Sequence, residues 1–293
     1  MNVALPQQLL AKLACPRCRQ PLQPAADGPA PALQCTFCGQ TFPIQQGIPL
    51  LFPDERPAAW TASQRALYDG IAPHYDTSIP EHVAAHYRSK RVSLVRRLVA
   101  PGAAVLDVGC GTGTLAEALR HAGYDVYGLD ASTGMLAEMA ARQRGTPVAG
   151  FCERLPFAGG AFDLAITVAT LHHISDAGRV AQTLTEMCRV VSPGGFVVAW
   201  DHNPNNPYWP ILMRRVPQDT GDERLVPLDE IVAGLQAAGV QEIETRRSGL
   251  VPDFTPRPLL ALATLIEAVV ERTPGLNVFC AHNVVIGRKH AEP

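Results

Sequence analysis

The sequence lacks an excess of charge of either sign. It holds 25 basic residues against 27 acidic ones, a formal net charge of −2, and lysine occurs only at Lys12, Lys90 and Lys289. Surfaces that bind nucleic acid normally need clustered positive charge. The overall charge therefore does not favour a nucleic-acid partner. A local basic patch that binds nucleic acid is the remaining alternative.

Long apolar runs are also missing. The longest apolar region, Pro258 to Val270, is too short to span a bilayer and contains Glu267. Residues 1–16 lack the cationic start and unbroken apolar stretch of a secretory signal. We therefore expect a cytoplasmic protein without a membrane span, in which the eight cysteines bind metal or lie buried rather than form disulfides.

The composition is that of a folded chain with a large core. Of the 293 residues, 47% are hydrophobic and 18% are charged, so the length fits one full-sized enzyme domain plus a smaller unit. We predict a small domain over residues 1–54 and a larger one over residues 55–293. The stretch from Asp54 to Gln64, rich in charged residues, proline and small residues, is the predicted linker.

Four cysteines organise the N-terminal unit. Cys15 and Cys18 form one CxxC motif, and Cys35 and Cys38 form a second. Two facing motifs supply the four thiolates that tetrahedral zinc prefers, with no position left for water. Because so short a unit buries little core, the metal would also let it fold. The sequence predicts a structural zinc site; a redox dithiol pair and a chance pattern are the alternatives.

The same region resembles a known family. Residues 8–54, with the two cysteine motifs and the tail "FPIQQGIPLL", look like the small zinc-ribbon proteins that include the shared activator subunit of several tRNA, rRNA and release-factor methyltransferases. The resemblance implies a zinc ribbon that supports a methyltransferase and performs no chemistry itself.

Strand-like and helix-like segments alternate from about residue 100 onward. Apolar runs of strand type cover residues 103–109, 124–130, 162–169 and 196–202, and helical patterns cover residues 114–123, 135–145 and 180–195. Such alternation predicts an α/β fold, a parallel sheet with helices on both faces. Ligands of such sheets bind at the carboxyl ends of the strands.

A glycine loop follows the first of these strands. Gly109, Gly111 and Gly113 lie between a predicted strand and a predicted helix, where missing side chains let a ligand approach the backbone. Asp130 ends the next strand, where a carboxylate accepts ribose hydroxyls. NAD-dependent enzymes use a related loop, but Asp107 would repel a pyrophosphate and attract an ammonium or a sulfonium. The acids therefore favour a cationic cofactor.

These residues and those after them resemble the class I S-adenosylmethionine-dependent methyltransferases, in the branch of quinone-methylating and natural-product enzymes. Residues 105–119 look like the first motif of that family, and "GLDASTGML", "ERLPFAGGAFDLAI", "LHHISD" and "EMCRVVSPGGFVV" follow in order. The likeness covers about residues 67–289. It implies a Rossmann-like, seven-stranded sheet with an antiparallel last hairpin, in which residues 279–289 form the final reversed strand.

The resemblance implies S-adenosylmethionine as the cofactor. The implied cofactor-binding residues are Tyr75, Asp107, Gly109, Cys110, Gly111, Gly113, Asp130, Ala131, Met135, Cys152, Glu153 and Val168. One position departs from the family pattern: Phe151 stands where an acid usually holds the adenine amino group. The backbone near Cys152, the side chain of Glu153, or packing on Phe151 would then hold the adenine.

Three histidines are candidates for acid–base work. His172 and His173 follow the fourth strand and His202 follows the fifth, so all three are expected at the rim where a methyl group is delivered. Histidine suits removal of a hydroxyl or amine proton near neutral pH. We predict His173 as the base, with His172 or His202 assisting; the alternatives are that they hydrogen-bond loops, or that alignment alone drives the transfer.

Other segments are expected to cover the site. Residues 67–100 resemble the cap helices of this branch, with Tyr75 near the methionine end of the cofactor, or else only packing the cap. Residues 202–225 form a long insert that is predicted to cover a substrate. The helix predicted from Leu259 to Val270 is apolar enough to be a core helix or the wall of a site for a greasy substrate.

The sequence thus predicts a methyltransferase acting on an oxygen or nitrogen of a small molecule, such as a secondary metabolite, a lipid-linked compound or a quinone-like compound. An RNA-base methyltransferase is the alternative, because a ribbon fused to this domain also resembles the layout of an rRNA guanine methyltransferase. A non-catalytic scaffold that binds S-adenosylmethionine is a further one. No pattern fixes an oligomeric state.

Overall fold

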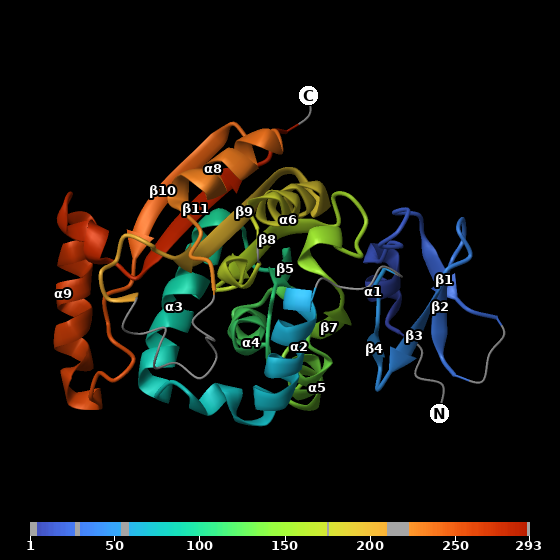
Figure 1. Ribbon diagram of the computed structural model, residues 1–293, viewed down its shortest axis with the longest axis horizontal. Coiled ribbons are helices and arrows are strands. Elements are labelled where there is room, and N and C mark those ends of the chain that lie inside the picture. The colour runs from blue at the N-terminus through green and yellow to red at the C-terminus, as the bar shows by residue number, and fades with distance from the viewer. Residues whose placement is uncertain (1–4, 27–29, 54–58, 175, 210–222, 292–293) are drawn as a thin grey trace.

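Two sheets organise the chain. The computed structural model describes residues 5–26, 30–53, 59–174, 176–209 and 223–291. A four-stranded sheet lies in the N-terminal part and a seven-stranded sheet in the rest, and Figure 1 shows them side by side along the long axis.

The small sheet follows a short helix, α1 (Gln7–Lys12). Its strands are β1 (Leu22–Pro24), β2 (Ala32–Cys35), β3 (Thr41–Gln45) and β4 (Ile48–Pro49), in that order and antiparallel throughout. Leu9, Leu33 and Phe42 are almost fully buried beneath it. Each CxxC motif turns back on itself, because Arg19 N–H donates to Cys15 O at 2.8 Å and Gly39 N–H to Cys35 O at 3.2 Å.

The large sheet has the order β10–β11–β9–β8–β5–β6–β7. Its strands are β5 (Ala104–Val108), β6 (Asp125–Asp130), β7 (Thr146–Ala149), β8 (Phe162–Val168), β9 (Val191–His202), β10 (Glu242–Ser248) and β11 (His282–Arg288). Six strands run in the same direction, and only β11, between β9 and β10, is reversed within this sheet. The predicted seven strands and reversed last strand are confirmed.

Helices cover both faces of this sheet, as predicted. On one face α6 (Ala177–Val190) and α8 (Leu228–Ala237) contribute buried residues to a shared core with Val197 and Val285. On the other face lie α3 (Glu81–Leu98), α4 (Thr114–His121) and α5 (Thr133–Ala141). Strand β9 begins at Val191 rather than at the predicted Phe196. Val191 and Pro193 both favour extended backbone, which explains the earlier start.

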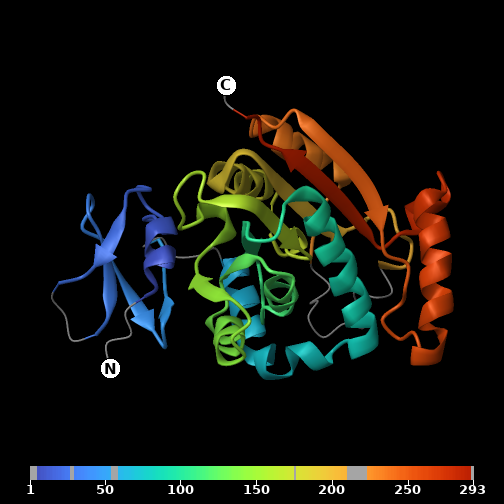
Figure 2. The ribbon, with the colours of Figure 1, turned by 180° about the vertical axis from the view of Figure 1, so that it is seen from behind.

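The ribbon is joined to the large sheet at the β7 edge. Leu50 forms a parallel bridge with Ala149, and Leu51 N–H donates to Ala149 O at 2.8 Å. Ala14 N–H donates to Pro156 O at 2.9 Å. Leu9 and Phe157 belong to one continuous core, so the two sheets share buried surface. Figure 2 shows the small sheet beside the large one from behind.

One expectation about a connecting segment is corrected, and another falls mostly on residues outside the described range. Helix α2 (Ala59–Ile71) begins inside the predicted linker, because residues 59–64 include good helix formers; residues 54–58 lie outside the described range. The cap therefore consists of α2, the 3₁₀ helix η1 (Ala72–Thr77) and α3. Of the predicted insert, residues 210–222 also lie outside the described range.

The predicted core helix is the other correction. Helix α9 (Leu260–Arg272) stands at the far end of the molecule from the ribbon, and its Leu265 is 64% exposed (Figure 1). It is neither buried nor part of the cavity wall described below. Among the described segments, none of the helices combines the length and hydropathy needed to cross a bilayer.

Candidate functional site

The glycine loop between β5 and α4 is shaped mainly by its neighbours. Gly109 has φ 75°, and a Cβ there would lie 2.4 Å from the Thr170 side chain. A Cβ on Gly113 would lie 2.6 Å from Met139. At Gly111 the nearest atom, on Tyr75, is 3.9 Å from such a Cβ, so this glycine has open space. The backbone is therefore bare toward a ligand at Gly111, while Gly109 and Gly113 are required by packing.

Asp130 lies at the carboxyl end of β6, beside this loop. Its Oδ2 accepts the Gly111 N–H at 2.8 Å, and its Oδ1 accepts the Ser132 N–H at 2.8 Å. Each oxygen keeps a second lone pair, so the carboxylate is held in place and can still accept ligand hydroxyls.

Asp107 at the end of β5 is almost fully buried. Burial raises the pKa of its carboxyl to about 7; Arg91 opposes the rise and Asp130 adds to it. A charge is stabilised here only if a cation lies nearby. Asp107 is therefore ready to become fully ionised when a cationic group binds.

Arg91 on α3 was not predicted from the sequence. Its guanidinium carbon lies 5.8 Å from the Trp200 ring centroid and 6.0 Å from that of Tyr87. Within the described chain its Nε has no hydrogen-bond partner, and burial lowers the pKa of the group. Arg91 lines the same cavity as Asp107, so the site holds a cation beside the acid.

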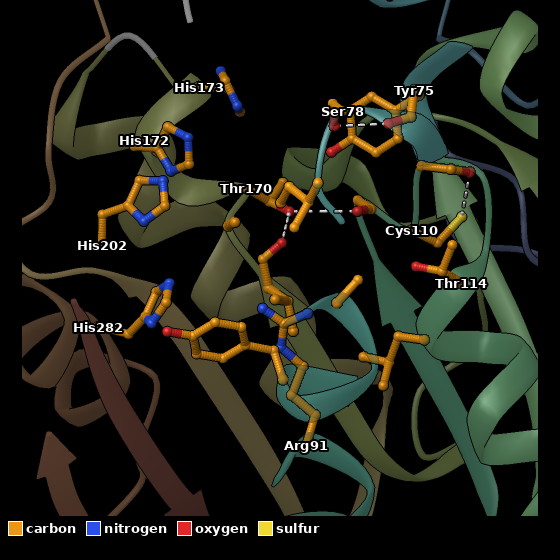
Figure 3. Close-up of a pocket in the computed structure, with 18 of the residues that line it drawn as sticks. Tyr75, Ser78, Arg91, Cys110, Thr114, Thr170, His172, His173, His202 and His282 are labelled. Carbon is orange, nitrogen blue, oxygen red and sulfur yellow. Dashed lines mark hydrogen bonds between the residues drawn. The ribbon is translucent and has the colours of Figure 1, made fainter. Parts of the chain in front are cut away.

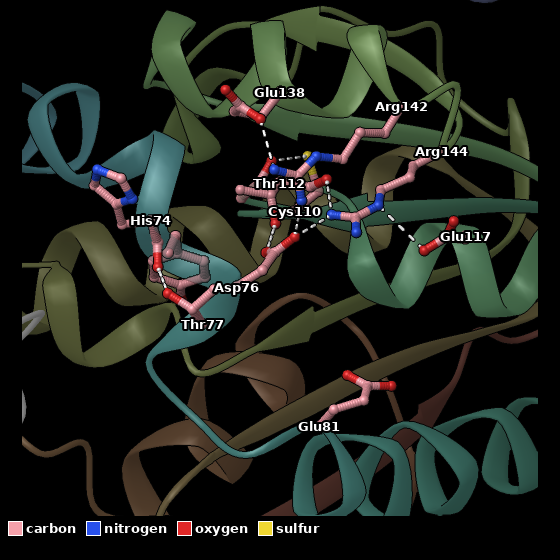
Figure 4. Close-up of polar contacts among 12 residues, drawn as sticks. His74, Asp76, Thr77, Glu81, Cys110, Thr112, Glu117, Glu138, Arg142 and Arg144 are labelled. Atoms are coloured by element: carbon pink, nitrogen blue, oxygen red, sulfur yellow. Dashed lines mark hydrogen bonds and ion pairs between the residues drawn. The ribbon is translucent and has the colours of Figure 1, made fainter.

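Two aspartates, Asp69 and Asp76, hold the cap over the loop, and Figure 4 shows the contacts of Asp76. Asp76 of η1 accepts hydrogen bonds from Thr112 Oγ1 at 2.5 Å and from Arg144 Nη1 at 2.6 Å, and it also pairs with Arg142. Asp69 of α2 accepts the Gly134 N–H at 2.8 Å, at the start of α5. These contacts hold the segment that carries Tyr75 against the cofactor-side strands.

Four histidines, His172, His173, His202 and His282, lie across the pocket from the glycine loop (Figure 3). We call them the histidine wall. The rings of His172 and His173 have centroids 4.0 Å apart, and those of His172 and His202 are stacked at 4.2 Å. His282 lies 5.5 Å from His202, because antiparallel pairing aligns the start of β11 with the end of β9. The three predicted histidines are thus brought together, and the structure adds a fourth that the sequence did not indicate.

Asp201 anchors this wall from β9. Its Oδ1 accepts His172 Nδ1–H at 2.7 Å and the His202 backbone N–H at 2.7 Å, and its Oδ2 accepts the Leu171 N–H at 2.6 Å and the Thr170 N–H at 3.2 Å. Burial acts to raise the pKa of Asp201, but His172 and these donors hold it below its usual range. The carboxylate therefore stays charged and fixes the Nδ1–H form of His172.

The other imidazoles are neutral near pH 7. Burial, aided by neighbouring histidines for His173 and His202 and by Arg91 for His282, lowers the pKa of His173 and of His282 to about 3 and that of His202 well below its ordinary value. His173 Nε2 hydrogen-bonds Tyr68 Oη at 2.8 Å, and the His202 ring packs on Trp209 with centroids 3.8 Å apart.

One cavity of about 920 Å³ connects the two sides. Most of the predicted residues line it: Tyr75, Asp107, Gly109, Cys110, Gly111, Asp130, Ala131, Cys152, Glu153, Val168, His172, His173 and His202. Gly113 and Met135 are not among the lining residues; Met135 is fully buried in the packing of α5. Phe151 lines the cavity and packs on Phe52 at 4.9 Å, while Glu153 pairs with Arg179 at 3.3 Å.

The four ribbon cysteines form a separate cluster. Their Sγ atoms all lie within 4.8 Å of one another, with 3.8 Å between Cys15 and Cys38 and 3.4 Å between Cys18 and Cys35. Four sulfurs at the corners of a tetrahedron around zinc are separated by roughly 3.8 Å. The residues present therefore fit such an ion.

Comparisons with known proteins agree with this geometry. The family described as "Methyltransferase domain" matches residues 106–199, and the family described as "Trm112p-like protein" matches residues 7–47. A SAM-dependent methyltransferase from Thermotoga maritima superposes with a TM-score of 0.57 at 21% identity, over 77% of this chain and 99% of that one, which shows a shared fold.

Relatives similar in sequence indicate which group of methyltransferases the chain resembles. The demethylmenaquinone methyltransferase of Renibacterium salmoninarum is 36% identical over 160 residues, which cover 52% of this chain and 66% of that protein. That of Mycolicibacterium paratuberculosis is 34% identical over 160 residues, which cover 52% of this chain and 68% of that protein. The chain carries a methyltransferase domain. More particularly, it belongs to the family that includes these relatives, of whose length it spans about two thirds, and it carries a Trm112p-like region near its N-terminal end.

Proposed function

We propose that the protein transfers the methyl group of S-adenosylmethionine to an oxygen or nitrogen of a small, partly apolar molecule held against the histidine wall. The observation that carries this proposal is the single cavity, which joins the acids at the ends of β5 and β6 to His172 and His202. Cofactor and acceptor can meet only in a space that both sides share.

The cofactor side suits an amino acid joined to a nucleoside. Asp130 would accept ribose hydroxyls, Asp107 would pair with the ammonium, and Arg91 would pair with the carboxylate. Phe151 and the backbone at Cys152 would hold the adenine in place of the usual acid. When bound, the cofactor supplies an electrophilic methyl group on a sulfonium.

On the acceptor side, we assign the base to His172 rather than to His173, which the sequence favoured. The Asp201 carboxylate orients His172 at 2.7 Å and leaves Nε2 as its proton acceptor. Burial and the neighbouring His172 lower the pKa of His173 to about 3, which makes it a weak base. We assign His173, with Tyr68, to positioning the acceptor.

The lining of the acceptor side favours a planar, partly aromatic molecule. Tyr68, Trp209 and Phe279 line the cavity together with the histidines. The relatives are named for demethylmenaquinone, a quinone-type compound, which supports a quinone-like or phenolic acceptor.

For the ribbon we propose one structural zinc ion bound by Cys15, Cys18, Cys35 and Cys38. Cysteines in a reducing compartment more often bind metal than form disulfides, so we propose the cytoplasm as the location. We also propose that residues 1–54 form a supporting domain and that residues 55–293 form the domain that carries out methyl transfer.

The test is a methylation assay with isotopically labelled S-adenosylmethionine. Reduced quinones, simple phenols, amines and ribosomal RNA fragments would be offered in parallel, and Asp107→Asn would serve as the variant with an impaired cofactor site. The proposal predicts a labelled small-molecule product that the variant forms far more slowly. Labelling of RNA alone would overturn the substrate class.

A further inference from the structure

Helix α9 exposes an apolar stripe. Four of its side chains recur at the spacing of one helix face and are about half exposed or more: Leu262 at 56%, Leu265 at 64%, Ile266 at 49% and Val269 at 57%. Leu259 before the helix and Leu276 after it extend the stripe. Contiguous exposed apolar surface of this kind marks an interaction site. We call these six residues the α9 face.

The opposite side of α9 is fastened to the body, so the exposure is fixed. Glu267 is buried and accepts hydrogen bonds from His86 Nε2 at 2.8 Å, Lys90 Nζ at 2.5 Å and the Leu250 N–H at 2.6 Å. The pKa of Glu267 is held at about 2, because these donors outweigh its burial. The helix therefore presents the α9 face outward in one orientation.

Within residues 255–275, the exposed charged side chains are arginines. Between Phe254 and Leu276 the only acids are Glu267 and Glu271, and Glu271 also turns inward to accept the Ser248 hydroxyl at 2.9 Å. Arg257 before the helix and Arg272 at its end are exposed. An apolar stripe with cations at its ends is typical of helices that lie in the surface of an anionic bilayer.

Apolar surface also lies at the mouth of the cavity. Ile79, Tyr208 and Phe279 are all exposed by 36% or more and all line the cavity. Phe279 belongs to the short helix η5 (Leu276–Phe279), which follows α9 and begins with a residue of the α9 face. η5 therefore connects the α9 face along the chain with the exposed edge of the cavity.

We propose that the α9 face docks onto an anionic lipid surface, with α9 lying in the plane of the interface. A second copy of the chain fits less well, because two-fold pairing of the helices would bring arginines together with no acid on the face to neutralise them. Anionic head groups supply the missing charge.

The experiment is sedimentation of the full chain with vesicles of phosphatidylcholine, with and without phosphatidylglycerol. Wild type should bind the anionic vesicles, and salt should weaken the binding. Leu265→Gln with Ile266→Gln should weaken it at least about tenfold, or ~1.4 kcal/mol. Phe37→Gln, at a 79% exposed site on the ribbon, is the matched control and should bind like wild type.

The charge is tested separately. Arg257→Gln with Arg272→Gln should lose the preference for phosphatidylglycerol, while Arg17→Gln on the ribbon should keep it. Equal thermal midpoints would establish that all variants are folded. Failure of wild type to bind either vesicle, or binding that survives the Leu265 and Ile266 changes, would overturn the proposal; light scattering would then test whether the face joins two copies. No methyl acceptor is needed, so failure here leaves the proposed function standing.

Discussion

At the scale of single residues, Asp107 makes cofactor binding sensitive to pH. Its pKa of about 7 means that the fraction ionised rises as pH rises through neutrality. If only the carboxylate pairs with the cofactor ammonium, affinity should increase about eightfold between pH 5.5 and pH 6.5, below the range where an α-amino group loses its proton. Calorimetry over this range measures the effect. A flat profile in wild type, or the same slope in Asp107→Asn, would remove Asp107 from this role.

His172 carries the second residue-scale prediction. Because Asp201 holds its ring by a 2.7 Å hydrogen bond, His172→Ala should lower turnover by ~10²–10⁴-fold while leaving cofactor affinity near that of wild type. His121→Ala, on the surface of α4, is the control. Steady-state rates with an identified acceptor would decide. Turnover within a few fold of wild type would mean that positioning alone drives the reaction.

At the scale of elements, the cap should depend on Asp76. Its contacts with Thr112, Arg142 and Arg144 hold η1, and with it Tyr75, over the glycine loop. Asp76→Asn should weaken cofactor binding about fivefold, the ~1 kcal/mol expected for a partly exposed charge network. Glu244→Gln, which removes one carboxylate of an exposed pair on β10, is the comparison and should change nothing. Equal affinities for both variants would mean that the cap is held by packing instead.

Elements with local signals were predictable from the sequence. The β5 loop, Asp130 at the end of β6 and the reversed strand near the C-terminal end all follow from short patterns, and the structure has them. Arg91 and His282 carried no such signal, because they reach the site only through the packing of α3 and the insertion of β11 between β9 and β10. The exposure of α9 could not be read either, since apolar periodicity is the same for a core helix and an outward one.

At the scale of the whole molecule, the ribbon and the large sheet should unfold together. They share a continuous core and main-chain hydrogen bonds at Leu51 and Ala14. Stripping zinc with a chelator should therefore lower the thermal midpoint of the entire chain by at least roughly 5 °C, in a single transition. Scanning calorimetry measures this, and the same chelator saturated with zinc is the control. A separate low-temperature transition, with the methyltransferase part unchanged, would mean that the ribbon is energetically independent.

The most direct test of a cofactor site at the ends of β5 and β6 is calorimetry with S-adenosylmethionine and with NAD. We predict one molecule of S-adenosylmethionine per chain and no heat with NAD. Asp130→Ala should weaken binding by ~1.5–3 kcal/mol, as for hydrogen bonds to a charged group, while Asp125→Asn at the opposite end of β6 should not. Binding of NAD without S-adenosylmethionine, or equal affinity in the Asp130 and Asp125 variants, would contradict the account.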